Sequence, residues 1–215
     1  MAMIEARGLT RVYPGGGGIF GVSFSVERGE CLGCFGAAGA GKTTLIRLLM
    51  GFVRPQQGGC AIDGADCWAF PSYVQTQVGY LPEFPLVWEG MRGVDFLRFY
   101  ARYRGEHGTG RMGELIERLA VRPELRLRRM PLPMRRKLAL IAALMQAPPV
   151  LLLDEPLAGL EGEEGAQVVE LLRVERQAGR TMLLTSADRS LAELCDRRIA
   201  LESGLPRTEG GEVPV

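Results

Sequence analysis

The sequence predicts an α/β protein with a mostly parallel sheet at its core, and two observations lead to this prediction. Short apolar runs alternate with segments of helical periodicity through the last third of the chain, and such alternation produces parallel strands joined by right-handed crossovers. Near residue 40, a glycine-rich stretch lies between a strand-like run and a helix-like run. The chain has 215 residues, and at about 150 residues per domain we expect 1–215 to form one domain.

The alternating segments follow a helix predicted over 138–145, which ends before Pro148. At 150–153, an unbroken apolar run indicates a strand buried on both faces of a sheet. After it we expect, in order, a helix over 163–177, a strand over 182–184, a helix over 191–195 and a strand over 199–201. Residues 203–215 are polar and rich in glycine and proline, which predicts a flexible tail.

The N-terminal third predicts strands over 4–9, 19–26 and 31–35. Gly15–Gly18 lies between the first two, and we interpret it as the turn of an antiparallel hairpin. The alternative is a second phosphate-binding loop, but neither the lysine nor the Ser/Thr that such a loop requires follows this run.

Between these two parts of the chain we expect a helical insertion over 93–136. Apolar residues recur at helical spacing from about 94 to 120, and Gly105–Gly110 interrupts the pattern. His107, the only histidine of the chain, lies in this interruption, where we expect an exposed loop.

Composition excludes several classes of protein. Hydrophobic residues make up 47% and charged residues 24%, which is typical of a globular chain. Lys and Arg (26) nearly balance Asp and Glu (25), giving a net charge of +1, whereas a dedicated nucleic-acid binder carries a basic surplus. No apolar run reaches the roughly 18 residues that span a bilayer. The N-terminus shows no secretory signal. We therefore expect a cytoplasmic protein without a nucleic-acid partner.

The cysteines predict reduced, structural thiols, because they are odd in number and scattered. Cys31 and Cys34 form a C-x-x-C pattern within a predicted strand, where positions three apart face opposite sides of a sheet. Zinc or redox chemistry is the alternative interpretation of this pair. The other cysteines are Cys60, Cys67 and Cys195.

The strand over 31–35 runs into a loop that matches the phosphate-binding motif G-x-x-x-x-G-K-[ST]. Small residues let the backbone approach phosphate, and the N-terminus of the following helix adds positive potential. Lys42 would place its ammonium between the β- and γ-phosphates of ATP, and Thr43 would offer its hydroxyl to Mg²⁺. The predicted nucleotide-binding residues of this loop are Gly36, Ala37, Ala38, Gly39, Ala40, Gly41, Lys42, Thr43 and Thr44.

Two carboxylates, Asp154 and Glu155, follow the apolar run 150–153. Carboxylates at the end of a buried strand are costly unless a cation or hydrogen-bond donors meet them. A nucleotide site needs such groups, so we expect Asp154 to hold Mg²⁺ and Glu155 to polarise the attacking water. A helix cap after the strand is the alternative.

With these motifs in place, the chain resembles ATP-binding-cassette (ABC) proteins over about residues 4–201. Leu153–Leu160 (Leu-Asp-Glu-Pro-Leu-Ala-Gly-Leu) is similar to their second nucleotide motif and D-loop. The resemblance implies the ABC ATPase fold and a head-to-tail dimer, in which ATP lies between one subunit's phosphate loop and the other's signature motif. It also implies an integral membrane transporter subunit as partner, and it places Tyr13 against adenine. A core strand residue is the alternative for Tyr13.

The chain departs from the family pattern at several positions. Met130–Met134 (Met-Pro-Leu-Pro-Met) stands where the family has a signature such as Leu-Ser-Gly-Gly-Gln, so the serine hydroxyl and both glycines are missing. Ala187 stands where a histidine usually contacts the γ-phosphate, and alanine neither hydrogen-bonds through its side chain nor relays a proton. Glu83 replaces the usual glutamine and still offers an oxygen to Mg²⁺. Glu161 replaces an aspartate.

These features predict the ATP-binding subunit of an ABC transporter that binds ATP and Mg²⁺ at a dimer interface and hydrolyses ATP weakly. We expect it in the cytoplasm, peripheral to the inner face of the cell membrane. Three alternatives stay open: a fully active subunit, a degenerate partner in a heterodimer, and a soluble ABC-type protein acting outside transport. The short helical insertion and the neutral charge disfavour the third.

Overall fold

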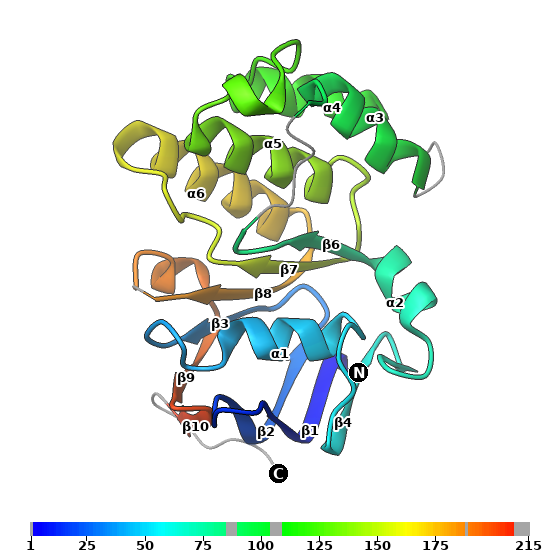
Figure 1. Cartoon of the computed structure of the whole chain (residues 1–215), viewed down its shortest axis with the longest axis vertical. Coiled ribbons are helices and arrows are strands. Elements are labelled where there is room, and N and C mark those ends of the chain that lie inside the picture. The colour runs from blue at the N-terminus through cyan, green and yellow to red at the C-terminus, as the bar shows by residue number, and fades with distance from the viewer. Residues whose placement is uncertain (1, 85–89, 104–108, 188, 209–215) are drawn as a thin grey trace.

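The computed structural model describes residues 2–84, 90–103, 109–187 and 189–208, which form two sheets and a set of helices (Figure 1). The strands are β1 (Ala2–Val12), β2 (Gly18–Glu27), β3 (Cys31–Phe35), β4 (Gln57–Ile62), β5 (Ala65–Asp66), β6 (Val78–Leu81), β7 (Val150–Asp154), β8 (Thr181–Ser186), β9 (Arg197–Glu202) and β10 (Leu205–Thr208). The helices are α1 (Lys42–Leu49), α2 (Pro71–Gln77), α3 (Gly93–Tyr103), α4 (Thr109–Arg118), α5 (Leu132–Leu144) and α6 (Gly162–Gln177), with short 3₁₀ helices η1 (Leu127–Arg129) and η2 (Ala192–Leu194).

The larger sheet has the strand order β10-β9-β3-β8-β7-β6. Its inner strands pair in parallel, and only β10 pairs antiparallel, with β9. The smaller sheet, β2-β1-β4-β5, is antiparallel. The mostly parallel core with N-terminal antiparallel strands is therefore confirmed.

Each face of the larger sheet has its own core. Helices α5 and α6 lie on one face, with α3 and α4 packed on α5, and α1 lies between the other face and the smaller sheet (Figure 1). Cys31 belongs to the first core and Cys34 to the second, as expected for positions three apart on a strand. Their side chains point to opposite faces, which excludes joint metal binding, and all five cysteines are free and buried.

The predicted N-terminal hairpin is confirmed, with its turn at Tyr13–Gly17. Tyr13 N–H donates to the Gly17 carbonyl oxygen at 2.8 Å. A Cβ on Gly18 would lie 1.9 Å from the carbonyl oxygen of Arg11, so the turn can close only with glycine at this position.

The predicted helices of the insertion correspond to α3 and α4. Residues 104–108, which include His107, lie outside the described residues, so the loop predicted there stays a prediction. Helix α5 begins at Leu132, six residues before the predicted start at 138. The prolines of Met130–Met134 allow this start, because proline is tolerated in the first turn of a helix.

Two predictions for the C-terminal part were wrong. The tail predicted over 203–215 contains β10, because residues 205–208 pair with β9 after a tight turn in which Gly204 has a φ of 82°. Pro206 is compatible with this strand because β10 lies at the sheet edge. The helix predicted over 191–195 is only the short η2. Residues 209–215 lie outside the described residues.

Within the described part of the chain, none of the helices combines the length and the hydropathy that a bilayer crossing requires.

Candidate nucleotide-binding site

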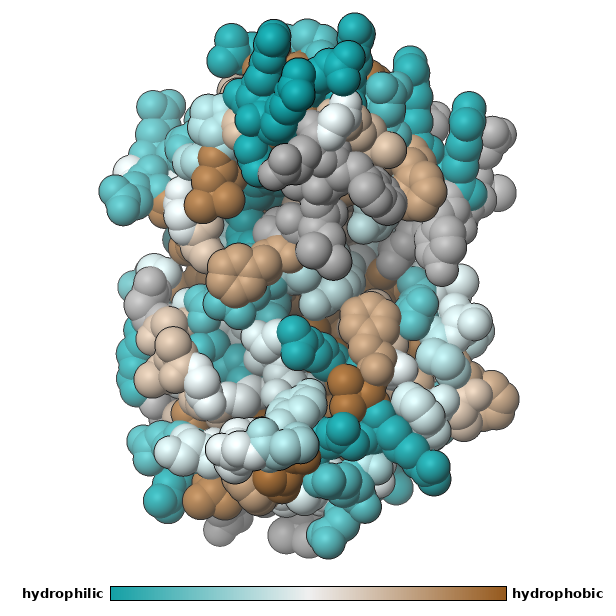
Figure 2. Space-filling model, viewed as in Figure 1, coloured by the Kyte–Doolittle hydropathy of each residue, from teal (hydrophilic) through white to brown (hydrophobic). Residues whose placement is uncertain are grey.

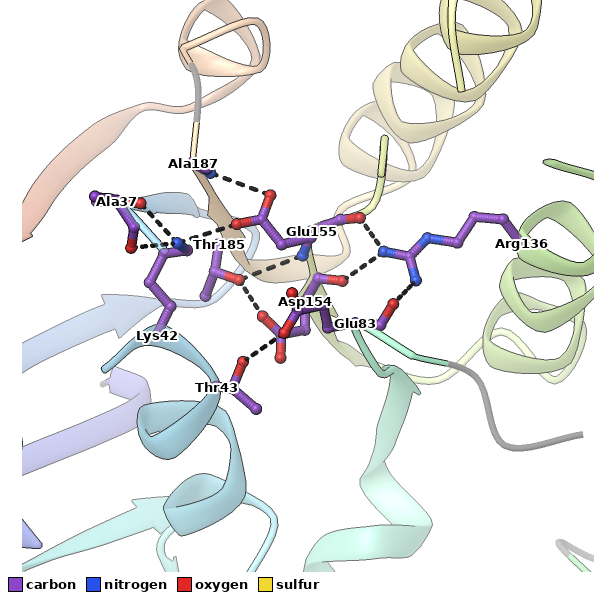
Figure 3. Close-up of polar contacts among 10 residues, drawn as sticks. Ala37, Lys42, Thr43, Glu83, Arg136, Asp154, Glu155, Thr185 and Ala187 are labelled. Atoms are coloured by element: carbon purple, nitrogen blue, oxygen red, sulfur yellow. Dashed lines mark hydrogen bonds and ion pairs between the residues drawn. The ribbon is translucent and has the colours of Figure 1, made fainter. Parts of the chain in front are cut away.

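The parallel strands β3, β6, β7 and β8 end at one edge of the sheet, and the predicted site residues meet there (Figure 3). The phosphate-binding loop connects β3 to α1. Gly41, its last residue, has a φ of 103°, and a Cβ there would lie 2.6 Å from the Gly18 carbonyl oxygen. The loop thus lies tightly against the N-terminal hairpin. No side chain caps the first turn of α1, so its N–H groups are available to an anion.

Lys42 lies inside the curve of the loop and is 6% exposed. Its ammonium donates to the carbonyl oxygens of Gly36 at 2.6 Å and Ala37 at 3.1 Å, and it pairs with Glu155 Oε1 at 3.1 Å (Figure 3). The ammonium therefore occupies the centre of the site, where a phosphate oxygen would compete with these partners.

Asp154, at the end of β7, is completely buried. Its Oδ1 accepts a hydrogen bond from the Thr185 hydroxyl on β8 at 2.6 Å. Its Oδ2 is buried and has no partner among the described residues. A buried carboxylate oxygen without a donor is costly, so the site is incomplete as it stands.

The residues around Asp154 fit Mg²⁺. Thr43 donates its hydroxyl to Glu83 Oε2 at 3.3 Å, which brings together the hydroxyl and one of the carboxylates that we predict as ligands. Mg²⁺ prefers oxygen ligands and keeps several waters, so a site formed by few protein oxygens suits it. The unpaired Oδ2 of Asp154 is the atom that a cation, or water bound to it, would satisfy.

Glu155 has a φ of 49°, in the left-handed region that few non-glycine residues adopt. Its N–H donates to the carbonyl oxygen of Thr185 at 3.1 Å. Its carboxylate accepts the N–H of Ala187 at 3.1 Å through Oε2 and pairs with Lys42 through Oε1. This arrangement directs the carboxylate toward the phosphate-binding loop.

A pocket of about 450 Å³ lies between these groups, and Tyr13 lines it together with the loop. Among the predicted site residues, Gly36, Ala37, Ala40 and Asp154 do not line this pocket. The carbonyl oxygen of Ala40 accepts the Gly204 N–H at 3.0 Å on the other side of the loop. The lining residues are Tyr13, Gly17, Gly18, Ala38, Gly39, Gly41, Lys42, Thr43, Thr44, Glu83, Glu155, Ala158 and Ala187.

Tyr13 is part of the pocket wall and not of either core. The guanidinium of Arg11 lies 5.3 Å from the centroid of its ring, within cation–π range. The ring is thus held at the pocket by a neighbour on β1.

Burial is the largest cause of the pKa shifts of Cys34, Tyr80 and Arg136 near the site. Burial raises the pKa of the Cys34 thiol to about 12, with Lys42 opposing this shift. Burial, with the charge of Asp154, raises the pKa of Tyr80 to about 12. Neither group is therefore suited to act as a base at neutral pH. Burial also lowers the pKa of Arg136, although a guanidinium remains protonated at neutral pH.

The departures from the signature are visible at the N-terminus of α5. Pro131 takes the N-cap position and makes no side-chain cap, and Leu132 exposes 65% of its surface. Neither Pro131 nor Pro133 has a backbone N–H to donate. At the end of β8, Ala187 contributes its backbone N–H, which is already bonded to Glu155.

Sequence analysis missed Thr185 and Arg136. Thr185 pairs with Asp154 in the register of β7 and β8, so a hydroxyl directly after the predicted strand 182–184 was the available signal. Arg136 is 3% exposed and bonds to backbone carbonyls of two elements. A basic residue in an Arg-Arg-Lys run gives no such signal.

We expect Thr185→Val to weaken magnesium-dependent ATP binding about 10–100-fold, the usual cost of losing a residue that orients a metal ligand. The valine removes the donor to Asp154 Oδ1, which then has no fixed orientation. Equilibrium binding of ATP with and without Mg²⁺ measures the effect. Thr185→Ser restores the hydroxyl and should restore binding. Thr181→Val is the matched control, because Thr181 is a buried threonine of the same strand whose hydroxyl accepts the Gly29 N–H.

Fold and site together define a P-loop nucleotide-binding protein. Comparison with known proteins identifies the family within this class. The family model described as "ABC transporter" matches residues 19–158. The Nod factor export ATP-binding protein I of Ralstonia nicotianae is 32% identical over 97% of this chain and 67% of that protein. A solved ATP-binding subunit of an ABC transporter has a TM-score of 0.85 at 25% identity, over 96% of this chain and 90% of that chain.

A dimeric ATP-binding cassette in a post-hydrolysis state with ADP and Pi bound has a TM-score of 0.86 at 17% identity, over 98% of this chain and all (100%) of that chain. This similarity shows a common fold. The family match and the identity to the export protein show more: the chain belongs to the ABC transporter family, as an ABC-type ATPase and the ATP-binding subunit of a transporter.

Proposed function

We propose that this chain binds Mg²⁺ and ATP with the residues predicted from its sequence, and that it hydrolyses ATP weakly while driving a membrane-embedded partner. The adenine lies against Tyr13, the phosphates lie in the loop over 36–44, and Thr43, Glu83 and Asp154 hold the metal. The metal would supply charge neutralisation on the phosphates. Glu155 orients the attacking water and accepts its proton.

One observation carries this proposal. Asp154 Oδ2, at the end of β7, is buried and has no partner among the described residues. A cation, or water bound to it, would satisfy this carboxylate oxygen. Lys42 and Glu155 pair across the same site at 3.1 Å. Triphosphate and metal would separate these two charges and give each a new partner.

Weakened hydrolysis is supported by what surrounds Glu155. Among the described residues, the partners of its carboxylate are Lys42 and the Ala187 N–H, and neither is a histidine. In the family a histidine at this position contacts the γ-phosphate. Alanine leaves Glu155 without that help, so we expect slow turnover even when ATP is bound.

A heterodimer is the pairing that α5 favours. In a head-to-tail dimer, the N-terminus of α5 faces the partner's ATP, and here it offers Pro131, Leu132 and Pro133 in place of a hydroxyl and two glycines. A homodimer would repeat this loss at both sites. A partner with an intact signature would complete the site of this chain, and this chain would complete the other site poorly.

The membrane partner would meet the apolar side chains between the insertion and the sheets, which Figure 2 shows in the middle of one face. Phe52 is 50% exposed and packs edge-on against Tyr80, on the strand leading to Glu83. Phe99 of α3 is 46% exposed. The relative from Ralstonia nicotianae is named as an export protein, and we propose export here also, from the cytoplasmic face of the cell membrane. In the part of the chain that the structure describes, the exposed large hydrophobic residues are Phe52, Trp68, Phe70, Tyr73, Phe84, Phe99, Leu132 and Leu205.

Ala187→His tests the proposed function. We expect steady-state ATP hydrolysis to rise at least about tenfold, since a positioned acid–base group contributes about 10²–10⁴-fold where a site is built for it. The assay is run with and without a membrane fraction. Ala187→Leu fills similar space without a polar atom and should give no increase. A fast wild-type rate that the histidine leaves unchanged would contradict weakened hydrolysis.

A further inference from the structure

Arg136 links two segments of the nucleotide site by hydrogen bonds to their backbone carbonyl oxygens. It lies on the second turn of α5, and its side chain reaches from that helix to the sheet edge (Figure 3). Nη1 donates to the carbonyl oxygen of Pro82 at 2.9 Å and also to that of Glu83. Nη2 donates to the carbonyl oxygen of Asp154 at 3.0 Å and also to that of Glu155.

Three of the four carbonyl oxygens belong to Glu83, Asp154 and Glu155, whose side chains form the predicted metal and water site. The fourth belongs to Pro82, the residue before Glu83. Pro82 and Glu83 follow the end of β6. Asp154 is the last residue of β7, and Glu155 follows it. These two segments leave neighbouring parallel strands, and beyond Leu81 the pairing of β6 with β7 has ended. Beyond the last sheet hydrogen bonds, the guanidinium links the two segments through its own hydrogen bonds and fixes the distance between them.

Burial makes the hydrogen bonds of the Arg136 guanidinium strong and their loss costly. Arg136 is 3% exposed, and its Nε is buried without a partner among the described residues. A buried cation is costly unless many oxygens surround it. Here carbonyl oxygens supply the hydrogen bonds, and the carboxylates of Asp154, Glu155 and Glu83 all favour the charged guanidinium. The planar, two-pronged shape of a guanidinium suits it to hold two segments at once.

We propose that Arg136 is a positioning residue that sets the spacing of Glu83 from Asp154 and Glu155, and thereby the affinity of the site for magnesium-bound ATP. This inference rests on the proposed function of the same site. Arg136 acts through the backbone, and contacts neither nucleotide nor metal. Because α5 begins at the degenerate signature, Arg136 also ties the helix that faces a dimer partner to this chain's own metal ligands.

A purely structural role for Arg136 makes a different prediction. If the guanidinium only satisfied carbonyl oxygens, its loss would lower stability and reduce ATP binding alike with and without metal. Lys42 and the loop over 36–44 hold the phosphates without contacting Arg136, so a positioning role predicts loss of the metal-dependent part alone.

The experiment measures ATP affinity of the full chain by equilibrium titration, in Mg²⁺ and in EDTA, for Arg136→Met and Arg136→Lys. We expect the gain in affinity due to Mg²⁺ to fall about 10–100-fold in Arg136→Met, the usual cost of removing an outer-shell partner of a metal site. Affinity in EDTA should stay unchanged. Arg136→Lys keeps the charge but not the fork, and should fall between Arg136→Met and the wild type.

Arg135→Met is the matched control. Arg135 is the neighbouring arginine, and it bonds to the carbonyl oxygens of Met130 and Arg128, before α5 and away from the metal residues. It should keep the full gain from Mg²⁺.

Three results would overturn the inference: an unchanged gain from Mg²⁺ in both Arg136 variants, equal losses with and without metal, or the same loss in Arg135→Met. If Arg136→Met does not fold, Arg136→Lys alone decides between these outcomes. A wild-type chain that binds no ATP in either condition would instead refute the proposed function, and the inference with it.

Discussion

Lys42→Ala is expected to abolish the stabilisation of the fold by Mg²⁺ and ATP. A ligand at about 100 times its dissociation constant stabilises the native state by about 2.7 kcal/mol, and each kcal/mol raises the Tm of a chain of this size by roughly 2–4 °C. The wild type should therefore gain roughly 5–10 °C, as these relations combine. Without the ammonium at the centre of the loop, the variant should gain nothing. Thermal denaturation with and without Mg²⁺ and ATP measures the shift.

The chain provides a close control for this variant. Lys42 and Lys137 are its two lysines, and both are buried and ion-paired. Lys137 pairs with Glu164 at 3.0 Å, between α5 and α6 and outside the nucleotide pocket. Each variant is compared with its own Tm in the absence of ligand, since loss of either pair alters the free protein. A ligand shift that persists in Lys42→Ala, or disappears equally in Lys137→Ala, would rule out the assigned site.

The phosphate-binding loop could be predicted because its information is local. Gly41 and Lys42 are adjacent in sequence, and the loop needs only a strand before it and a helix after it. The carboxylates were predictable for a similar reason, since Asp154 and Glu155 end an unbroken apolar run. In both cases a short segment carries the chemistry and its structural context together.

The partners of these residues were not predictable, because they come from distant segments. Thr185 lies 31 residues from Asp154, and Arg136 lies 54 residues from Pro82. Nothing in the residues next to Arg136 indicates that its side chain is buried. Only the parallel register of β7 and β8, and the packing of α5 on the sheet, bring these groups to the site.

The missed elements are short and weakly patterned. Strand β5 has two residues, and β4 begins with a glutamine and two glycines, which are poor strand formers. Strand β10 contains Pro206, and its identity as a strand depends on an edge offered by β9. Tertiary pairing decided these segments, and local propensity did not.

Glu155→Gln is expected to lower the rate of ATP hydrolysis about 10²–10⁴-fold, the usual contribution of a positioned general base. Glutamine has nearly the same shape, and its amide oxygen can still accept the Ala187 N–H that Glu155 Oε2 accepts at 3.1 Å. It cannot take a proton from water. The variant should therefore keep the thermal shift with Mg²⁺ and ATP that Lys42→Ala loses.

The comparison of these two variants separates binding from turnover. Glu163→Gln removes an exposed carboxylate in the first turn of α6 and should change neither quantity. The rate is measured at saturating ATP, so that any change in affinity does not enter. If Glu155→Gln hydrolyses ATP as fast as the wild type, another group must act as the base. Cys34 and Tyr80 are not suited to be that base, because their pKa values are raised to about 12. Glu83 would then be the carboxylate to replace next.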